Sequence, residues 1–479
     1  MKITIIGGGS TYTPELVYGI LKWKDSPVKT IVLEDIDAER LNIVGDYCRA
    51  LSDVLNPSIN IVKTTDLDES LAGSDFVVTQ IRVGGNRKRA EDEKLAMNMG
   101  WLGQETTGAV GFLKAFRTIP VMIDIVNRIQ AISPNAFLIN FTNPAGIIST
   151  AIYQNTGKKN MVGLCNVPIF LETNIRAIIQ KYAPDLFKKN VDGKTSEIGN
   201  KEEDPESGYN LFLSWGGLNH LSWVFDIELE GRSIMEEVLD IITSDDFDPS
   251  PYFPVNKEYV KLTRTIPSPY LRYFTETGKV IEELSKAPTR GEQVMKIERN
   301  LLDIYKKETD LIDRGEYAQD NPPSLPGELS KRGGADYSRL AVKLIKDLCK
   351  IRFVEGLKSS SNRGDSCGQL KNSPVHVLNV PDRDDFFVKS DEFCEIPVKL
   401  VPGEKGAISG QFFEPLYPDK NLILPWIYDL VKRVKIYENL TVEASLNRSE
   451  EKAINALISN PLVHDRKRIE EFISKALQE

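Results

Sequence analysis

The sequence has little histidine and little cysteine. Its 479 residues contain three histidines and five cysteines. The cysteines are odd in number and follow no recurring spacing, so a framework of disulfides is not expected. Reduced thiols are typical of a cytoplasm, and we therefore expect a cytoplasmic protein.

Long hydrophobic runs and an excess of positive charge are also missing. No stretch approaches the roughly 20 apolar residues of a membrane span. The N-terminal run MKITII breaks at glycines, unlike a signal peptide. The net charge of -9 argues against nucleic acid as the main partner, because a face that binds many phosphates needs a basic excess. We expect neither a membrane nor a nucleic acid as a partner.

Strand-like and helix-like segments alternate through the first 190 residues. Apolar strands are expected within residues 2–6, 29–37, 59–66, 75–85, 135–146 and 159–168, with helical periodicity between several of them. Such alternation predicts an α/β protein with a doubly wound parallel sheet.

The pattern changes after about residue 190. Residues 193–207 and 357–373 are polar and read as exposed loops or insertions, while residues 209–231 look like antiparallel strands, followed by long helical segments. We predict two domains, a Rossmann-like domain at 1–190 and an α+β domain at 191–479 for substrate, metal and oligomer contacts.

The glycine-rich stretch GGGSTYTPE lies between the first expected strand and helix. Gly7 and Gly9 fit the first two glycines of a dinucleotide-binding loop, although Tyr12 occupies the third glycine position. An acid, Asp35, ends the second strand, where it would bind ribose hydroxyls and repel a 2′-phosphate. NAD is favoured over NADP, and a glycine-rich turn without a ligand remains the alternative.

Cys165 and His220 are candidate metal ligands. Cys165 follows an apolar strand in GLCNVP, at the sheet edge where ligands gather in α/β folds. His220 lies in WGGLNHLSW, beside two glycines that permit close approach. The ordinary alternative is a small buried thiol and a satisfied core imidazole.

Polar residues follow other strands of the expected sheet. Arg82 and Arg89 come after the fourth strand, and Arg290 lies in a turn, which suggests a clamp for a phosphate or merely a solvated helix start. Glu105 lies in the glycine-rich GQETTGAVG, a site loop or a hinge. Asn140 and Asn143 follow an apolar strand, where an unpaired amide would be costly unless it binds something.

Taken together, these stretches resemble the NAD- and manganese-dependent glycoside hydrolases of family four, and most closely the branch of 6-phospho-β-glucosidases. The matching pieces are GGGSTYTPELV, QIRVGG, RAEDEK, GQETTG, INFTNPAG, GLCNVP, GGLNH, PSPYLRY and TRGEQV, in the family's order, with weaker likeness in YENLTVEA. These enzymes are an exception to the two-carboxylate scheme of glycosidases.

The resemblance implies an unusual hydrolysis. The sugar is oxidised reversibly at C3, a base removes the proton at C2, the glycosidic oxygen leaves from C1, and water adds, so that NAD is regenerated. A divalent cation polarises the C2 and C3 oxygens. The expected substrates are 6-phospho-β-glucosides such as cellobiose 6-phosphate.

The resemblance also assigns roles to residues. The residues that would bind NAD are Gly7, Gly8, Gly9, Ser10, Thr11, Asp35 and Arg82. The metal ligands would be Cys165 and His220, with substrate oxygens completing the coordination shell, and the residues that would bind the sugar phosphate are Arg89, Asn143, Asn166 and Arg290. The catalytic groups would be Tyr270, as the base at C2, and Glu105, as an acid or a positioning carboxylate. Tyr273 is an alternative base.

Asn166 decides the choice of anomer. Members that act on α-glucosides tend to carry aspartate at this position, where it could protonate a leaving group. Manganese follows from the resemblance, since a thiolate by itself would favour softer metals. A 6-phospho-α-glucosidase, an NAD-dependent sugar-phosphate dehydrogenase and a redox-responsive NAD-binding regulator remain open, and we expect a homodimer or homotetramer.

Overall fold

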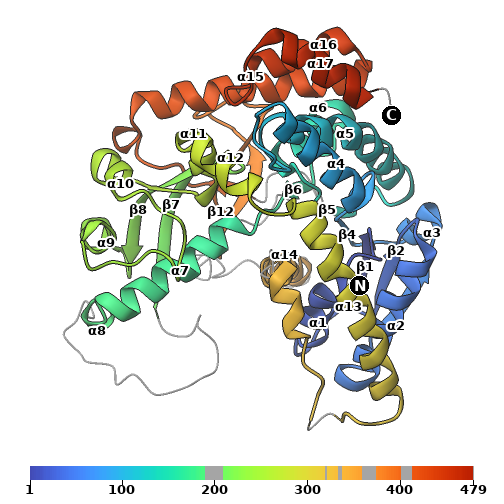
Figure 1. Cartoon of the computed structure of the whole chain (residues 1–479). Helices are drawn as coiled ribbons and strands as arrows, with labels where there is room; N and C mark the ends of the chain where they lie inside the picture. Colours follow the sequence, from blue (N-terminus) through green and yellow to red (C-terminus); the bar gives the residue numbers. More distant parts are fainter. Residues whose placement is uncertain (189–208, 319–320, 333–336, 359–373, 401–412, 478–479) are drawn as a thin grey trace.

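The structure is a computed structural model that describes residues 1–188, 209–318, 321–332, 337–358, 374–400 and 413–477 (Figure 1). The polar stretch at 193–207, and residues 359–373 of the second one, lie outside the described residues.

The elements in chain order are β1 (Lys2–Ile6), α1 (Thr13–Leu21), β2 (Thr30–Glu34), α2 (Ala38–Leu55), β3 (Asn60–Thr64), α3 (Leu67–Leu71), β4 (Phe76–Thr79), α4 (Gly85–Asn98), α5 (Gly108–Ile132), β5 (Phe137–Asn140), α6 (Ala145–Thr156), β6 (Met161–Gly163), α7 (Val167–Tyr182), α8 (Asp185–Lys188), β7 (Leu211–Leu218), β8 (Leu221–Leu229), β9 (Arg232–Ser233), α9 (Met235–Thr243), α10 (Lys257–Thr263), β10 (Ile266–Pro267), η1 (Pro269–Leu271), α11 (Arg272–Thr275), α12 (Thr277–Ser285), α13 (Arg290–Asp313), η2 (Gly327–Arg332), α14 (Tyr337–Lys358), β11 (Val375–Pro381), β12 (Phe393–Leu400), β13 (Phe413–Pro415), η4 (Lys420–Leu422), α15 (Pro425–Asn447), α16 (Glu450–Ser459) and α17 (Arg466–Leu477).

Six parallel strands form one half of the large sheet. They lie in the order β3-β2-β1-β4-β5-β6, and each neighbouring pair is parallel. This is the strand order of Rossmann folds, so the predicted doubly wound sheet is confirmed. The order reverses between β1 and β4, and ligands of such sheets bind at the carboxyl ends of the strands there.

The strands of this half are apolar because helices cover both faces of the sheet. β4 and β5 are buried at every position, as expected for parallel strands. α1 starts directly after the glycine loop with proline in its first turn, and the side chain of Asp37 caps α2 by accepting from Arg40 N.

Three strands from the C-terminal half extend the same sheet. β11 pairs antiparallel with β6, β12 with β11, and β13 with β12. The sheet therefore crosses the position at which the sequence suggested a domain boundary, and the division at residue 190 stays a prediction about separable units.

A smaller sheet carries the predicted antiparallel strands. β7 and β8 form a hairpin whose two other neighbours are β10 and β9. The hairpin packs with α7 and α9 around its own apolar core, which includes Trp215, Ile227 and Leu239. The turn of this hairpin points back toward the large sheet, because β7 also packs against β12 (Figure 1).

The C-terminal helices complete the fold. α15 packs on α5 and α16, and α13 packs on α2 and α4, so the second half of the chain covers the first. The expected α+β architecture of this half, antiparallel strands plus helices, is confirmed. Within the described residues, no helix is both long and apolar enough to span a membrane.

Candidate active site

An open cleft of about 1470 Å³ lies at the carboxyl ends of β1 and β4. This exceeds the usual 300–1,000 Å³ of small-molecule pockets and could take a dinucleotide together with a sugar. The sequence-predicted residues that line it are Gly7, Ser10, Asp35, Arg82, Arg89, Glu105, Asn143, Asn166, His220, Tyr270 and Arg290. Four other predicted residues, Gly8, Gly9, Thr11 and Cys165, do not line this cleft.

The glycine loop is shaped by its contacts with the neighbouring strands. Gly7 has φ of 87°, and a Cβ there would lie 3.1 Å from the backbone of Gln80. Gly8 and Gly9 are crowded by β2 and by Asp35, while Thr11 is fully buried. These residues set the tight turn, and Gly7 and Ser10 are the members of the loop that face the cleft.

Asp35 lies where the sequence placed it, at the end of β2. Its two carboxylate oxygens accept from the backbone N–H groups of Gly9 and Asp37, each at 2.9 Å. Next to it, burial together with Asp35 and Asp66 raises the pKa of Glu34 to about 7. An acidic corner of this kind suits ribose hydroxyls and opposes an additional phosphate.

Glu105 is surrounded by three cations. Its carboxylate is 3.0 Å from Arg89, 2.8 Å from Lys114 and in closer contact with Arg82. Burial opposes ionisation, but Arg82, Lys114 and Arg89 together hold the pKa of Glu105 well below its usual range. Glu105 is therefore a permanent anion, which favours a positioning role over that of a proton donor.

Lys114, in α5, is a site residue that the sequence analysis missed. It is buried and lines the cleft, and burial, reinforced by Arg82, lowers the pKa of Lys114 to about 7. The segment GFLKAFRTIP could have indicated a role for Lys114 in the site, because a lysine there interrupts a largely apolar helix.

Glu93 links Arg89 to the backbone next to Arg290. Arg89 Nε donates to Glu93 at 2.7 Å, and the same carboxylate accepts from the backbone N–H of Gly291 at 2.8 Å. The guanidinium of Arg290 donates to the carbonyl oxygens of Lys331 and Arg332, at 3.0 and 2.8 Å. Both arginines line the cleft, Arg89 from α4 and Arg290 from α13, and the phosphate clamp stays a prediction.

Asn140 does not serve a ligand. Its amide is fully buried and is satisfied by Thr79, Ser149 and the backbone of Thr142. The expected partners of the Asn140 amide are therefore other groups of the protein. The side chain that lines the cleft is that of Asn143, three residues later.

His220 and Tyr270 meet face to face. His220 is at the hairpin turn between β7 and β8, with φ of 67°, a conformation uncommon for a residue with a side chain. Its ring stacks on Tyr270, with centroids 3.9 Å apart and planes 4° from parallel. Tyr273, the alternative base, lies edge-on to Tyr270 at 5.4 Å. Burial lowers the pKa of His220 to about 3, so the imidazole is neutral and can offer a lone pair.

Cys165 lies behind the cleft at the start of α7. Burial and the charge of Glu395 raise the pKa of its thiol, and the backbone N–H groups of Val167 and Asn166 and the side chain of Asn219 oppose that rise only in part. Asn219 directly precedes His220 in the hairpin turn. Through Asn219, this turn lies next to the sulfur of Cys165.

A cysteine sulfur, which gives up its proton when it binds a metal, and a neutral imidazole fit a divalent cation as a partial ligand set. Within the described residues, no group of three or more His, Cys, Asp or Glu side chains could hold a metal by itself. The remaining ligands would have to come from another molecule, in agreement with the expected participation of substrate oxygens.

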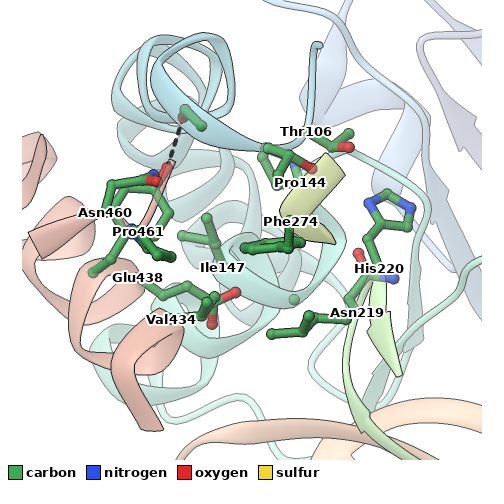
Figure 2. Close-up of a pocket in the computed structure, with 15 residues that line it drawn as sticks. Thr106, Pro144, Ile147, Asn219, His220, Phe274, Val434, Glu438, Asn460 and Pro461 are labelled. Atoms are coloured by element: carbon green, nitrogen blue, oxygen red, sulfur yellow. Dashed lines mark hydrogen bonds between the residues drawn. The ribbon is translucent and has the colours of Figure 1, made fainter. Parts of the chain in front are cut away.

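A second, much smaller cavity of about 30 Å³ is also lined by His220. Figure 2 shows His220 and Asn219 at one side of it and Glu438 of α15 at the opposite side. Its volume suits roughly two water molecules, not a sugar. His220 therefore lines both the large cleft and this small cavity.

Comparison with known proteins identifies the family. Residues 2–181 match the model described as family 4 glycosyl hydrolase, and residues 215–364 match the model of its C-terminal domain. The chain belongs to glycosyl hydrolase family 4.

Relatives within family 4 match over most of the chain. A 6-phospho-beta-glucosidase of Escherichia coli is 30% identical and covers 97% of this chain, which in turn covers 92% of that protein. The 6-phospho-beta glucosidase of Thermotoga maritima, solved with manganese, NAD+ and glucose-6-phosphate, superposes with a TM-score of 0.77 at 28% identity, covering 100% of this chain and 98% of its own. A 6-phospho-alpha-glucosidase of Leptotrichia buccalis is 29% identical over 61% of this chain and 64% of its own.

Proposed function

We propose that this family 4 glycosyl hydrolase cleaves 6-phospho-β-glucosides, such as cellobiose 6-phosphate, with NAD and a divalent cation, manganese, as cofactors. The observation that carries the proposal is the stack of Tyr270 on His220 in the same cleft as the dinucleotide loop. A glycosidase that displaces its leaving group directly has no use for such a loop. The relative from Thermotoga maritima, solved with manganese, NAD+ and glucose-6-phosphate, supports the same assignment.

The two cofactors would be held by different groups of residues. Gly7, Ser10 and Asp35 line the cleft and would hold NAD, and Cys165 with His220 would hold the cation. When bound, NAD supplies a reversible oxidation at C3 of the sugar and the cation supplies a Lewis acid for its C2 and C3 oxygens.

Within this arrangement Tyr270 is the proposed base. Oxidation at C3 makes the neighbouring C2 hydrogen acidic, and the phenolic oxygen of Tyr270 takes that proton. A phenol has an ordinary pKa near 10 and needs a nearby positive charge to act as a base at neutral pH. The stacking of Tyr270 on His220, a proposed ligand of the cation, supports this role, because the charge of a cation held by His220 would be felt by Tyr270.

The remaining polar residues bind and orient the sugar. Arg89 and Arg290 present guanidinium donors to the 6-phosphate, and Asn143 and Asn166 present amides to its hydroxyl groups. Glu105, fixed between three cations, holds Arg82 and Arg89 in place. Charge-assisted contacts of this kind select a phosphorylated sugar over a neutral one.

Asn166 favours a β-linked substrate. A carboxylic acid at this position, next to Cys165, could protonate a leaving group, and an amide cannot. A 6-phospho-α-glucosidase is the nearest alternative, and a sugar-phosphate dehydrogenase is the next. A dehydrogenase would accumulate NADH in proportion to product, whereas the hydrolase leaves no net NADH.

A direct assay tests the proposal. p-Nitrophenyl 6-phospho-β-glucoside and its α-anomer are compared with and without NAD and Mn²⁺. Release of nitrophenol from the β-anomer, dependent on both cofactors and without net NADH, is expected. Turnover of the α-anomer alone, or undiminished turnover after both cofactors are stripped, contradicts it.

We also propose a cytoplasmic homo-oligomer, a dimer or tetramer. Three of the described cysteines, Cys48, Cys165 and Cys394, are free thiols, which supports a reducing compartment. Size-exclusion chromatography with light scattering tests the oligomer, and a monomeric mass at working concentration contradicts it.

A further inference from the structure

A buried carboxylate, Glu395 of β12, lies directly behind the hairpin that carries His220. Its side chain is fully buried. It accepts hydrogen bonds from Trp215 Nε1 at 3.1 Å, Asn219 Nδ2 at 2.9 Å, Ser222 Oγ at 3.0 Å and Asn379 Nδ2 at 3.3 Å. Four donors therefore converge on one carboxyl group that receives no role from the resemblance.

The four partners show what Glu395 holds. Trp215 is in β7, Ser222 is in β8, and Asn219 is in the turn between them, so three of the four bonds tie the hairpin to the large sheet. A buried carboxylate is expensive, and a well-packed apolar residue is often as good for stability. A strand that needed only packing would have no reason to keep this group.

The amide of Asn219 links Glu395 to the thiol. One N–H of Asn219 donates to Glu395 at 2.9 Å, and the same side chain donates toward the sulfur of Cys165. The hydrogen bond to Glu395 fixes the nitrogen of the Asn219 amide on the side of Glu395. Asn219 therefore connects Glu395 to both candidate metal ligands, through its side chain to Cys165 and through the backbone to His220.

We propose that Glu395 is a positioning residue for the cation site, acting through Asn219 to orient Cys165 and the turn of His220. The proposal rests on the proposed function, because it assumes that these two residues hold a divalent cation. Groups that hydrogen-bond to metal ligands tune affinity, and their loss typically costs roughly 10–100-fold in metal binding or activity.

The test measures binding of Mn²⁺ itself. Full-length protein is stripped with a chelator and titrated with Mn²⁺, and the free ion is followed by electron paramagnetic resonance. Glu395→Gln keeps the shape of the side chain and places an amide N–H₂ among its donors. We expect the dissociation constant for Mn²⁺ to rise roughly 10–100-fold.

Two further variants separate positioning from general damage. Glu392→Gln is the matched control, because Glu392 is also buried, three residues earlier, and accepts from Lys389 N and Asn439 Nδ2 away from the hairpin. We expect its affinity for Mn²⁺ to stay within about 2-fold of the wild type. Asn219→Ala should weaken Mn²⁺ binding about as much as Glu395→Gln, and the double variant no more than either, because residues that act in series are not additive.

The affinity for NAD distinguishes a local effect on the cation site from general damage to the protein. We expect the NAD dissociation constant of Glu395→Gln to stay within about 2-fold, since Glu395 bonds to Trp215, Asn219, Ser222 and Asn379 and to no residue of the nucleotide loop. Wild-type Mn²⁺ affinity in a folded Glu395→Gln protein, or equal losses of Mn²⁺ and NAD binding, overturns the proposal. If Glu395→Gln does not fold, Asn219→Ala decides, and unchanged Mn²⁺ binding in that variant overturns it.

The outcome is separable from that of the proposed function. A wild-type protein that binds Mn²⁺ but hydrolyses no 6-phosphoglucoside contradicts the function and leaves the positioning result intact. A wild-type protein that hydrolyses the substrate, with variants that bind Mn²⁺ normally, contradicts only the role of Glu395.

Discussion

Replacing Glu105 by glutamine should destabilise the protein strongly, because it removes a carboxylate shared by three cations. The side chains of Glu105, Arg82, Arg89 and Lys114 are 14%, 24%, 10% and 8% exposed, so solvent screens them little. With charge centres about 4 Å apart and an effective dielectric constant of about 20, each pair contributes about 4 kcal/mol before desolvation. Desolvation offsets much of this, and removing one partner of a buried pair typically costs about 3–5 kcal/mol.

The cost should depend on pH through Lys114. The pKa of Lys114 is lowered from 10.5 to about 7 in the folded protein. The contribution of Lys114 to the free energy of unfolding is therefore fully present above the unfolded-state pKa of 10.5, and it is lost as the pH falls through about 7. Near pH 6 Lys114 is charged and interacts with Glu105, whereas near pH 8.5 it is largely neutral. Glu105→Gln should therefore cost more near pH 6 than near pH 8.5.

Equilibrium unfolding in urea, on protein free of nucleotide and metal, measures this free energy at both pH values. Glu91→Gln is the control, since Glu91 also faces two cations, Arg87 and Lys88, but its side chain is 40% exposed. That exposed site should cost less than about 1 kcal/mol. Adding Lys114→Met to Glu105→Gln should cost less than the sum of the two single changes. A Glu105→Gln loss no larger than that of Glu91→Gln, or equal at both pH values, refutes the reasoning.

Three further changes test the proposed chemistry. Arg290→Ala should raise the Michaelis constant for the phosphorylated glucoside by an amount corresponding to about 1.5–3 kcal/mol, measured against the unphosphorylated glucoside, and equal activity on both sugars contradicts the clamp. Tyr270→Phe should slow exchange of the C2 hydrogen with deuterated water while NAD still binds; product that forms in deuterated water with C2 fully protiated in the wild type contradicts elimination. Cys165→Ala should abolish tight Mn²⁺ binding in a titration of the free ion, and wild-type affinity there contradicts the metal assignment.

Local sequence patterns predicted the parallel half of the sheet and the glycine turn because both are set by nearby residues. Continuous apolar runs separated by helical periodicity specify buried parallel strands, and Gly7 is needed where the backbone of Gln80, just after β4, approaches within 3.1 Å of a Cβ position. The same logic placed Asp35 at the end of β2. Residues at strand ends share one edge of the sheet, so Arg82, Asn143 and Asn166 were predictable as neighbours.

Other site residues could not be read from local pattern because their function comes from partners far away in sequence. Lys114 resembles an isolated charge in an apolar helix until Glu105 and Arg82 are placed around it. Asn140 resembles Asn143 in sequence, and only its buried bonds to Thr79 and Ser149 show that it is structural.

By itself, the sequence determined the fold class, the nucleotide end of the cleft and, through the resemblance, the family. The tertiary structure alone decided that β11–β13 extend the N-terminal sheet and that Glu395 reaches the hairpin of His220. Glu395 lies 173 residues from Ser222 and 176 from Asn219, and hydrogen bonds at such separations leave no periodicity in the chain. They arise only when packing of β12 against β7 brings a carboxylate and its donors together in a dry interior, where each must find a partner.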